Sequence, residues 1–205
     1  MNKNRQITRR AATDKNTDGW PQELHPVVRR VISARGFSPD MLDHSLQKML
    51  PVSDLEFTEQ AAERLAKARQ LQQSVLILGD FDADGATATA LMMSCLSAYG
   101  FEQCEFLVPD RQRFGYGLSP AIVELAAESA PDIIVTVDNG ISSHAGVETA
   151  HQHGIDVLVT DHHLPGETLP AAEVIVNPNH PDSKFPSKVL AGVGVAFYVM
   201  AALGQ

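Results

Sequence analysis

The sequence has little of what membrane-spanning or disulfide-stabilised proteins need. Cysteine occurs only twice in 205 residues, at Cys95 and Cys104, and neither belongs to a CxxC or Cys/His ligand pattern. No apolar run approaches the ~20 residues of a bilayer span, and the polar, Arg-containing N-terminus lacks the apolar core of a signal peptide. We therefore expect reduced cysteines, no membrane partner and a cytoplasmic protein.

Charge is unevenly distributed along the chain. The hydrophobic content of 44% and charged content of 20% are those of a soluble globular protein. Residues 1–35 contain eight basic and three acidic residues and have a net charge of +5. Because the whole chain has a net charge of −9, residues 36–205 have a net charge of −14. We expect residues 1–20 to form a mobile basic arm. Such an arm on an acidic body can contact a polyanion, or it can be an ordinary solvated tail, and both readings stay open.

Hydrophobic spacing predicts a helical segment followed by alternating strands and helices. Helices are expected within a segment of residues 21–73, at 21–34, 39–49 and 56–73. Beyond it, strands are expected at 75–78, 104–108, 133–137, 157–160 and 174–176, and helices at 86–99, 120–127, 144–153 and 193–203. This alternation predicts an α/β fold for residues 74–205, with a Rossmann-like, mostly parallel sheet covered by helices on both faces.

Three carboxylates follow the first predicted strand. The stretch VLILGDFDADG places Asp80, Asp82 and Asp84 directly after a buried apolar run. If the backbone stays extended, alternate side chains point the same way and the three carboxylates converge. Their mutual repulsion would favour a hard divalent cation such as Mg²⁺ or Mn²⁺. The alternative is a solvated acidic loop.

Two later strands also end in ionisable residues. Asp138 follows one strand in VTVDNG, and Asp161, His162 and His163 follow the next in LVTDHH. Taken singly, Asp138 can be a turn residue and either histidine an ordinary loop residue. Because the carboxyl ends of parallel strands meet at one edge of the sheet, we expect them to join the three aspartates. Carboxylates and neutral imidazoles together suit a centre of two metal ions.

The motifs GDFDADG, VDNG and DHH, in this order and spacing, resemble the DHH phosphoesterase superfamily. The stretches VPDRQRFGYGLSP, TDHHLPGETLPAAEVIVNP and FPSKVLAGVGVAFYVM resemble the RecJ-type single-strand-specific exonucleases within it. The resemblance implies that Asp138 bridges two metal ions and that Asp161 supports the site. It further implies one ion on Asp80 and Asp82 and a second on Asp84 and His162. His163 is implied either to orient the scissile phosphate or to hold the geometry around the metal ligands.

The function implied by this resemblance is metal-dependent hydrolysis of phosphodiester bonds. The implied enzyme is a 5′-to-3′ exonuclease on single-stranded DNA in repair and recombination, with two Mn²⁺ or Mg²⁺ ions. Its implied partners are single-stranded DNA and, for the full-length enzyme, a helicase and a single-strand-binding protein. The residues expected to bind substrate through cations and a ring are Arg111, Arg113, Tyr116 and Lys188, although charged loops are often only solvated.

The sequence also departs from the family pattern. Arg113 and Phe114 stand where the family's loop usually has an acidic residue before GYG, and a further metal-ligating aspartate is expected beyond Gln205. We therefore expect this chain to correspond to the amino-terminal part of such an enzyme and to have little activity alone. Two alternatives remain. One is another DHH phosphoesterase, acting on oligonucleotides, cyclic dinucleotides or pyrophosphate. The other is a silent module that binds metal or nucleic acid.

Overall fold

The computed structural model describes residues 19–43 and 45–205, so most of the predicted basic arm lies outside the described residues. The chain divides into two compact units, Met1–Leu50 and Pro51–Gln205. Among the described residues, no helix combines the length and the apolar character that crossing a membrane requires.

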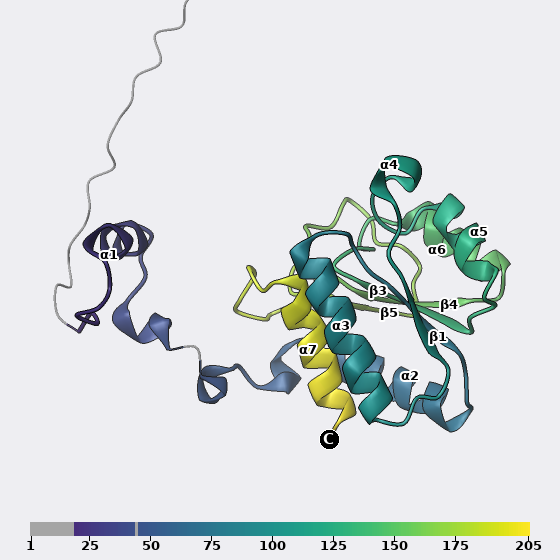
Figure 1. Ribbon diagram of the computed structural model, residues 1–205, viewed down its shortest axis with the longest axis horizontal. Helices are drawn as coiled ribbons and strands as arrows, with labels where there is room; N and C mark the ends of the chain where they lie inside the picture. The colour runs from purple at the N-terminus through teal and green to yellow at the C-terminus, as the bar shows by residue number, and fades with distance from the viewer. Residues whose placement is uncertain (1–18, 44) are drawn as a thin grey trace, which may run out of the picture. The chain divides into compact units, whose positions relative to one another are not determined.

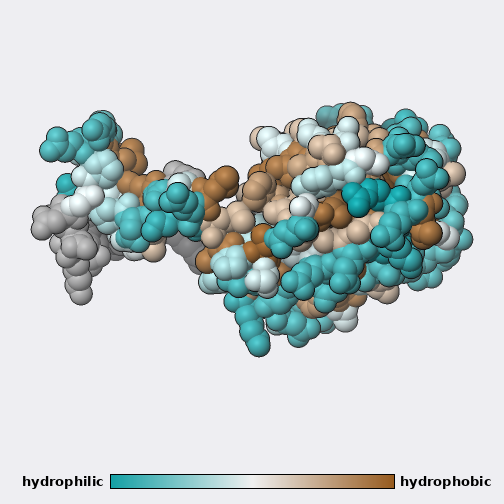
Figure 2. Space-filling model, turned by 90° about the horizontal axis from the view of Figure 1, so that it is seen from below, coloured by the Kyte–Doolittle hydropathy of each residue, from teal (hydrophilic) through white to brown (hydrophobic). Residues whose placement is uncertain are grey.

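The described part of the first unit consists of one helix and two short turns. Helix α1 spans Pro26–Ser33, and the 3₁₀ turns η1 and η2 span Pro39–Leu42 and Leu46–Lys48. The helix predicted over 39–49 is therefore wrong. Asp43 leaves the helical conformation and its side chain accepts the backbone N–H of Ser45, a local hydrogen bond that competes with helix formation. Hydrophobic surface is visible on this unit (Figure 2), where the exposed apolar residues are Val27, Val28, Val31, Phe37, Met41 and Leu46.

The second unit contains a five-stranded parallel sheet. The strands are β1 (Val75–Leu78), β2 (Cys104–Leu107), β3 (Ile133–Val137), β4 (Asp156–Thr160) and β5 (Val174–Val176). Their spatial order is β2-β1-β3-β4-β5, and every neighbouring pair is parallel. The central strands β1 and β3 are buried along their whole length, as continuous apolar runs predict for a sheet with both faces covered. The predicted sheet is thus confirmed.

Helices cover both faces of this sheet (Figure 1). Helices α2, α3 and α7 pack together, and α5 packs against α6 on the opposite face. Their bounds, with those of two short elements, are η3 Val52–Asp54, α2 Thr58–Gln70, α3 Ala83–Ala98, α4 Arg111–Phe114, α5 Pro120–Ala127, α6 His144–Gln152 and α7 Gly192–Leu203. Because α2 buries Ala61, Leu65 and Ala68 within this unit, the predicted domain of residues 74–205 lies in a compact unit that also contains residues 51–73.

The order of the strands determines where a site can form. From β1 the chain crosses through α3 to β2 on one side, and it then returns through α5 to β3 on the other side of β1. The connections therefore diverge between the carboxyl ends of β1 and β3. In open α/β sheets this switch point leaves a crevice in which ligands bind.

Candidate metal centre

The three aspartates after β1 do not lie on one extended segment. Asp80 is buried, with 8% of its surface exposed. Asp82 is the N-cap of α3, and its Oδ1 accepts the backbone N–H of Gly85 at 3.0 Å. Asp84 lies in the first turn of that helix, which begins at Ala83. The prediction of extended backbone through Asp84 is wrong, because an aspartate that satisfies a free N–H group starts a helix here.

Asp84 is held by the amino end of another helix. Its Oδ2 accepts the N–H of Gly192 and its Oδ1 the N–H of Val193, both at 2.7 Å, where α7 begins. The positive end of the helix dipole stabilises the carboxylate in this position. Its Oδ2 also lies 3.7 Å from Nε2 of His162. Each carboxylate oxygen has a second lone pair, so Asp84 can accept these N–H groups and still bind a metal ion.

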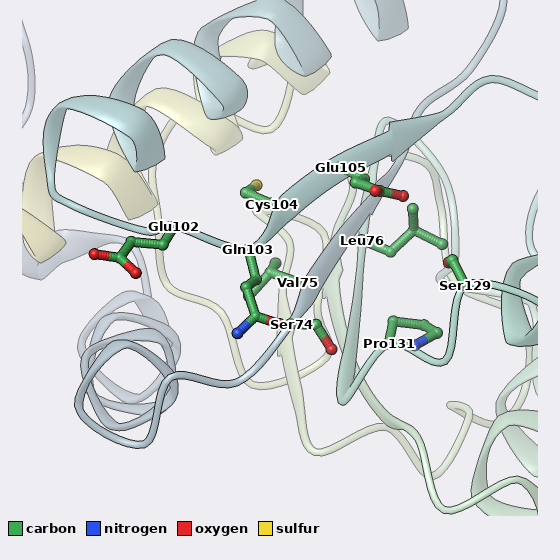
Figure 3. Close-up of a pocket in the computed structure, with 9 residues that line it drawn as sticks. All are labelled: Ser74, Val75, Leu76, Glu102, Gln103, Cys104, Glu105, Ser129 and Pro131. Carbon is green, nitrogen blue, oxygen red and sulfur yellow. The ribbon is translucent and has the colours of Figure 1, made fainter.

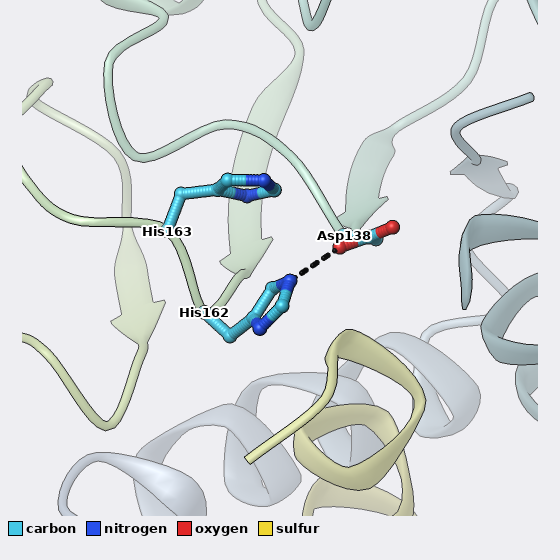
Figure 4. Close-up of side chains that lie close together, drawn as sticks. All are labelled: Asp138, His162 and His163. Carbon is cyan, nitrogen blue, oxygen red and sulfur yellow. Dashed lines mark ion pairs between the residues drawn. The ribbon is translucent and has the colours of Figure 1, made fainter. Parts of the chain in front are cut away.

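Asp138 lies at the switch point of the sheet. It follows β3 with a left-handed backbone, φ 62°, and only 2% of it is exposed. Its N–H donates to the Thr160 carbonyl at 3.0 Å, and the Asn139 amide that follows donates to the carbonyls of Val137 and Leu78. The side chain is directed at His162, with 3.0 Å between Asp138 Oδ1 and His162 Nε2 (Figure 4).

Asp161 orients the two histidines after β4. Its carboxylate is 1% exposed and accepts the backbone N–H groups of Ile141, His162 and His163, together with Nδ1–H of the His163 ring at 2.7 Å. Burial opposes ionisation of Asp161, but these hydrogen bonds outweigh it and hold its pKa below the usual value. The hydrogen bond to Asp161 raises the pKa of His163 and leaves Nε2 as the ring nitrogen available to a ligand.

Five of these side chains form two overlapping groups of ligand atoms, which do not include Asp84 or Asp161. In each group, one ligand atom from every residue lies within 4.8 Å of the others. Asp80, Asp82 and Asp138 make an all-carboxylate group, and Asp138, His162 and His163 make a mixed group. Asp138 belongs to both, as a bridging ligand would. Oxygen ligands suit Mg²⁺ and Mn²⁺, and the imidazoles favour Mn²⁺ over Mg²⁺ in the second group.

The clustering of acids perturbs their ionisation. Burial, with the charges of Asp84 and Asp82, raises the pKa of Asp138 to about 7. Burial and the charge of Asp82 also raise the pKa of Asp80. Bringing these carboxylates together therefore costs free energy at neutral pH, and a divalent cation between them removes that cost. The donor set fits such an ion on charge as well as on geometry.

The pKa of Asp138 predicts how metal binding depends on pH. Because a metal ion and a proton compete for this carboxylate, apparent Mn²⁺ affinity should rise about tenfold per pH unit between pH 5.5 and 6.5, and flatten above about 7. The stability of the metal-free protein should change in the opposite direction with pH. The folded state binds a proton at Asp138 more tightly than the unfolded state does, so the free energy of unfolding should decline as pH rises from about 4 to 7. Mn²⁺ titration calorimetry and denaturant unfolding test the two trends; an affinity that is constant from pH 5.5 to 7.5 would contradict the first.

Two of the four predicted substrate-binding residues lie at the metal centre. The Tyr116 hydroxyl donates to the Asp138 carbonyl at 3.0 Å and lies 3.2 Å from Nδ1 of His163. Burial raises the pKa of this phenol, which keeps its proton. Arg111, on α4, stacks over the ring of Phe81 with its guanidinium carbon 4.6 Å from the ring centroid. A cation and two rings thus border the ligand cluster.

The other two predicted substrate-binding residues contact neighbours in their own segments, Arg113 within α4 and Lys188 within the loop after β5. The Arg113 guanidinium lies 5.0 Å from the ring centroid of Phe114. Lys188 Nζ donates to the carbonyls of Pro178 and Ser183 at 2.6 and 2.9 Å. The structure therefore brings Arg111 and Tyr116 to the cluster and engages Lys188 within the loop after β5.

Three residues of the site escaped the sequence analysis. Asn177 and Asn179 hold the backbone of the histidine pair, and Gly192 packs against Asp138, where a Cβ would lie 2.7 Å from Oδ1. The sequence did contain a sign of Asn177, because this residue follows strand β5. Asp80, Asp138 and Asp161 follow strands β1, β3 and β4 in the same way. For Gly192 only the close approach of α7 to β3 gives a reason, and sequence spacing does not report it.

A separate hollow lies at the opposite end of the strands. Its volume is about 290 Å³, and it is lined by the first residues of β1 and β2, with Ser129 and Pro131 nearby (Figure 3). The side chains drawn there include two carboxylates, Glu102 and Glu105, without an imidazole or a cation among them. We place the function at the carboxyl ends, where the convergent ligands are.

Comparison with known proteins agrees with this geometry. The profile of the family described as "DHH family, N-terminal domain" matches residues 74–205. The chain is 53% identical over 196 residues to "Single-stranded-DNA-specific exonuclease RecJ" of Escherichia coli (strain K12), covering 95% of this chain and 34% of that protein. It is 36% identical to the protein of the same name from Bacillus subtilis (strain 168), covering 89% and 24%. The chain thus spans about a third or less of the length of these relatives.

Solved structures with the same fold hold manganese. The crystal structure of exonuclease RecJ bound to manganese superposes with a TM-score of 0.67 at 37% identity, over 76% of this chain and 39% of that one. The structure of RecJ in complex with Mn²⁺ from Thermus thermophilus gives a TM-score of 0.65 at 34% identity, over 82% and 23%. With its carboxylates and histidines gathered at three strand ends and its family profile matched from residue 74 onward, the chain belongs to the DHH family.

Proposed function

We propose that this chain carries the metal centre of an exonuclease that hydrolyses single-stranded DNA from its 5′ end, in DNA repair and recombination. The observation that carries the proposal is the pair of ligand groups that share Asp138. Support comes from relatives that bear the name single-stranded-DNA-specific exonuclease and from manganese in solved RecJ structures. A cytoplasmic location, and a helicase and a single-strand-binding protein as partners, belong to the same proposal.

Each ligand has a proposed place. Asp80 and Asp82 hold one Mn²⁺ or Mg²⁺ ion, Asp84 and His162 hold the other, and Asp138 bridges the two. Two such ions, when bound, would activate a water molecule as the nucleophile and would neutralise negative charge on the scissile phosphate and the leaving oxygen. The protein fixes the ligands before substrate arrives, through α7 at Asp84 and through Asp161 at the histidines.

The remaining residues orient the nucleic acid. His163, whose Nδ1–H is committed to Asp161, presents Nε2 to the phosphate. Arg111 contributes a cation for the next phosphate, and the rings of Phe81 and Tyr116 offer surfaces on which a base can stack. Arg113, from the same short helix, is proposed to contact the strand farther from the metal ions. These contacts use backbone charge and base faces, so they predict little sequence preference.

A hybrid enzyme tests this function directly. The 196 aligned residues of the Escherichia coli protein are replaced by this chain, which is 53% identical to them. We expect Mn²⁺-dependent release of nucleotides from 5′-labelled single strands, little release from duplex DNA, and none in the presence of a chelator. A preference for dinucleotides, cyclic dinucleotides or pyrophosphate would replace the proposal with another DHH phosphoesterase activity, and an inert hybrid that still binds Mn²⁺ would indicate a silent module.

A further inference from the structure

Two asparagines beyond β5 hold the carbonyl groups of the histidine pair. Asn177 Nδ2 donates to the carbonyl of His163 at 3.0 Å, and Asn179 Nδ2 donates to the carbonyl of His162 at 2.6 Å. Asn177 is 1% exposed and Asn179 is half-buried. A buried amide donor requires a partner, and here the partner is the main chain that carries the ligand rings.

The histidine backbone is thereby fixed from both sides. The N–H groups of His162 and His163 donate to Asp161, and their carbonyls accept from the asparagines. The direction of an imidazole follows from its backbone and its two side-chain torsions. Holding the peptide groups on both sides of each Cα therefore limits where Nε2 of His162 can point, and that nitrogen lies 3.0 Å from Asp138.

The loop that carries the asparagines is closed on itself. Asn177 Oδ1 accepts the N–H of Asn179 at 2.7 Å, and Asn179 Nδ2 also donates to the Lys188 carbonyl at 3.2 Å. The Lys188 ammonium bonds the carbonyls of Pro178 and Ser183, which joins the two ends of the loop. At its far side the Ser183 hydroxyl donates to Glu56 at 2.7 Å, immediately before α2. The asparagines are thus anchored to the body of the unit.

We propose that Asn177, Asn179 and Lys188 form a brace that positions His162 and His163 for metal binding. All three are positioning residues, and Lys188 acts through the loop instead of through contact with DNA. The brace itself rests on the hydrogen bonds alone, whereas its effect on metal affinity rests on the proposed function. Neutral amides suit this role because a carboxylate in the same place has no proton to donate to a carbonyl.

The test replaces each asparagine by the acid of the same size. In Asn179→Asp both donated bonds are lost, whereas Asn177→Asp keeps the Oδ1 that accepts the N–H of Asn179 and loses only the bond to His163. Gln60→Glu, on the exposed side of α2, adds the same charge outside the brace and serves as the control. Circular dichroism and thermal unfolding verify that each variant folds, and Asn179→Ala provides a second, uncharged variant at the half-buried position.

The first measurement uses the metal-free chain. Hydrogen exchange of peptides covering residues 161–165 should become roughly tenfold faster or more in Asn179→Asp and Asn179→Ala, and stay at the parent rate in Gln60→Glu, because the amides of the histidine pair open more often. Parent-like exchange in both Asn179 variants would overturn the brace. This result does not depend on whether the chain binds metal.

The second measurement is Mn²⁺ affinity. Loss of a group that orients a metal ligand typically lowers affinity 10- to 100-fold, so we expect a decrease of about tenfold or more in Asn179→Asp. The added negative charge alone would strengthen cation binding, so a decrease separates positioning from charge. Equal or tighter binding in Asn179→Asp would overturn the positioning role. A parent chain that binds no Mn²⁺ would count against the proposed metal centre, while the exchange rates would still decide the brace.

Discussion

Replacing Asp138 by asparagine should abolish metal binding and stabilise the metal-free protein at the same time. Asparagine tolerates the left-handed backbone at this position, φ 62°, and keeps an oxygen toward His162. It removes the carboxylate shared by both ligand groups. Loss of a residue that only orients a ligand typically lowers metal affinity 10- to 100-fold, so loss of this shared carboxylate should lower Mn²⁺ affinity by more than roughly 100-fold. Cleavage by the hybrid enzyme should fall to background.

The stabilisation follows from the raised pKa of Asp138. At pH 8 this buried carboxylate is charged beside two others, and the neutral amide removes the repulsion. The gain in unfolding free energy should be on the order of 1–3 kcal/mol at pH 8 and should vanish near pH 5, where the carboxyl group is already protonated. Urea unfolding at both pH values measures it, with Asp54→Asn, an exposed site in η3, as the control. A variant that binds Mn²⁺ normally, or that is less stable at pH 8, would contradict the assignment.

Replacing Gly192 by alanine should disable the site although no proposed ligand is itself replaced. The new Cβ would lie 2.7 Å from Asp138 Oδ1 and 2.8 Å from its Cβ, closer than such atoms approach in proteins. Either the Asp138 side chain or the start of α7 must move, and α7 also supplies the two N–H groups that hold Asp84. Because metal ligands tolerate displacements of only a few tenths of an ångström, we expect cleavage to fall roughly 100-fold or more.

The same substitution two residues farther on provides the matched control. In Gly194→Ala the added Cβ meets Cδ1 and Cγ of the Leu190 side chain, at 2.6 and 2.9 Å, and no proposed ligand. The partly exposed Leu190 side chain can turn away, so activity should stay within a few-fold of the parent. The two variants are compared by hybrid-enzyme cleavage and by Mn²⁺ affinity. Equal activity of Gly192→Ala and the parent would show that the close packing of α7 on Asp138 has no functional consequence.

The sequence predicted the sheet, and it predicted most of the residues that the structure gathers into the two candidate ligand groups, for a physical reason that is local. Buried parallel strands are continuous apolar runs, and the residue after each run must lie at the carboxyl edge of the sheet. Asp80, Asp138 and His162 were found by that rule. Applying it to β5 as well would have pointed to Asn177.

What the sequence could not give depends on contacts between distant segments. Asp84 was expected in extended backbone beyond the strand, because alternation alone does not reveal that Asp82 caps a helix. Gly192 becomes informative only when α7 is seen against Asp138, and Lys188 only when its ammonium is seen bonded to loop carbonyls. The spacing of residues in the sequence predicts which strand or helix a residue belongs to or follows. Its role depends on which neighbours in the folded chain contact it or hydrogen-bond to it.

The site draws on segments more than a hundred residues apart, from Asp80 after β1 to Gly192 at the start of α7. In the unfolded chain only the residues within each short run stay close together, Asp80 to Asp84 in one and Asp161 to His163 in the other, and either run alone holds a divalent ion weakly. Metal is therefore a ligand of the native state almost alone, and its binding free energy adds to that of folding. A shortage of manganese would therefore leave the unit that carries this site more easily unfolded.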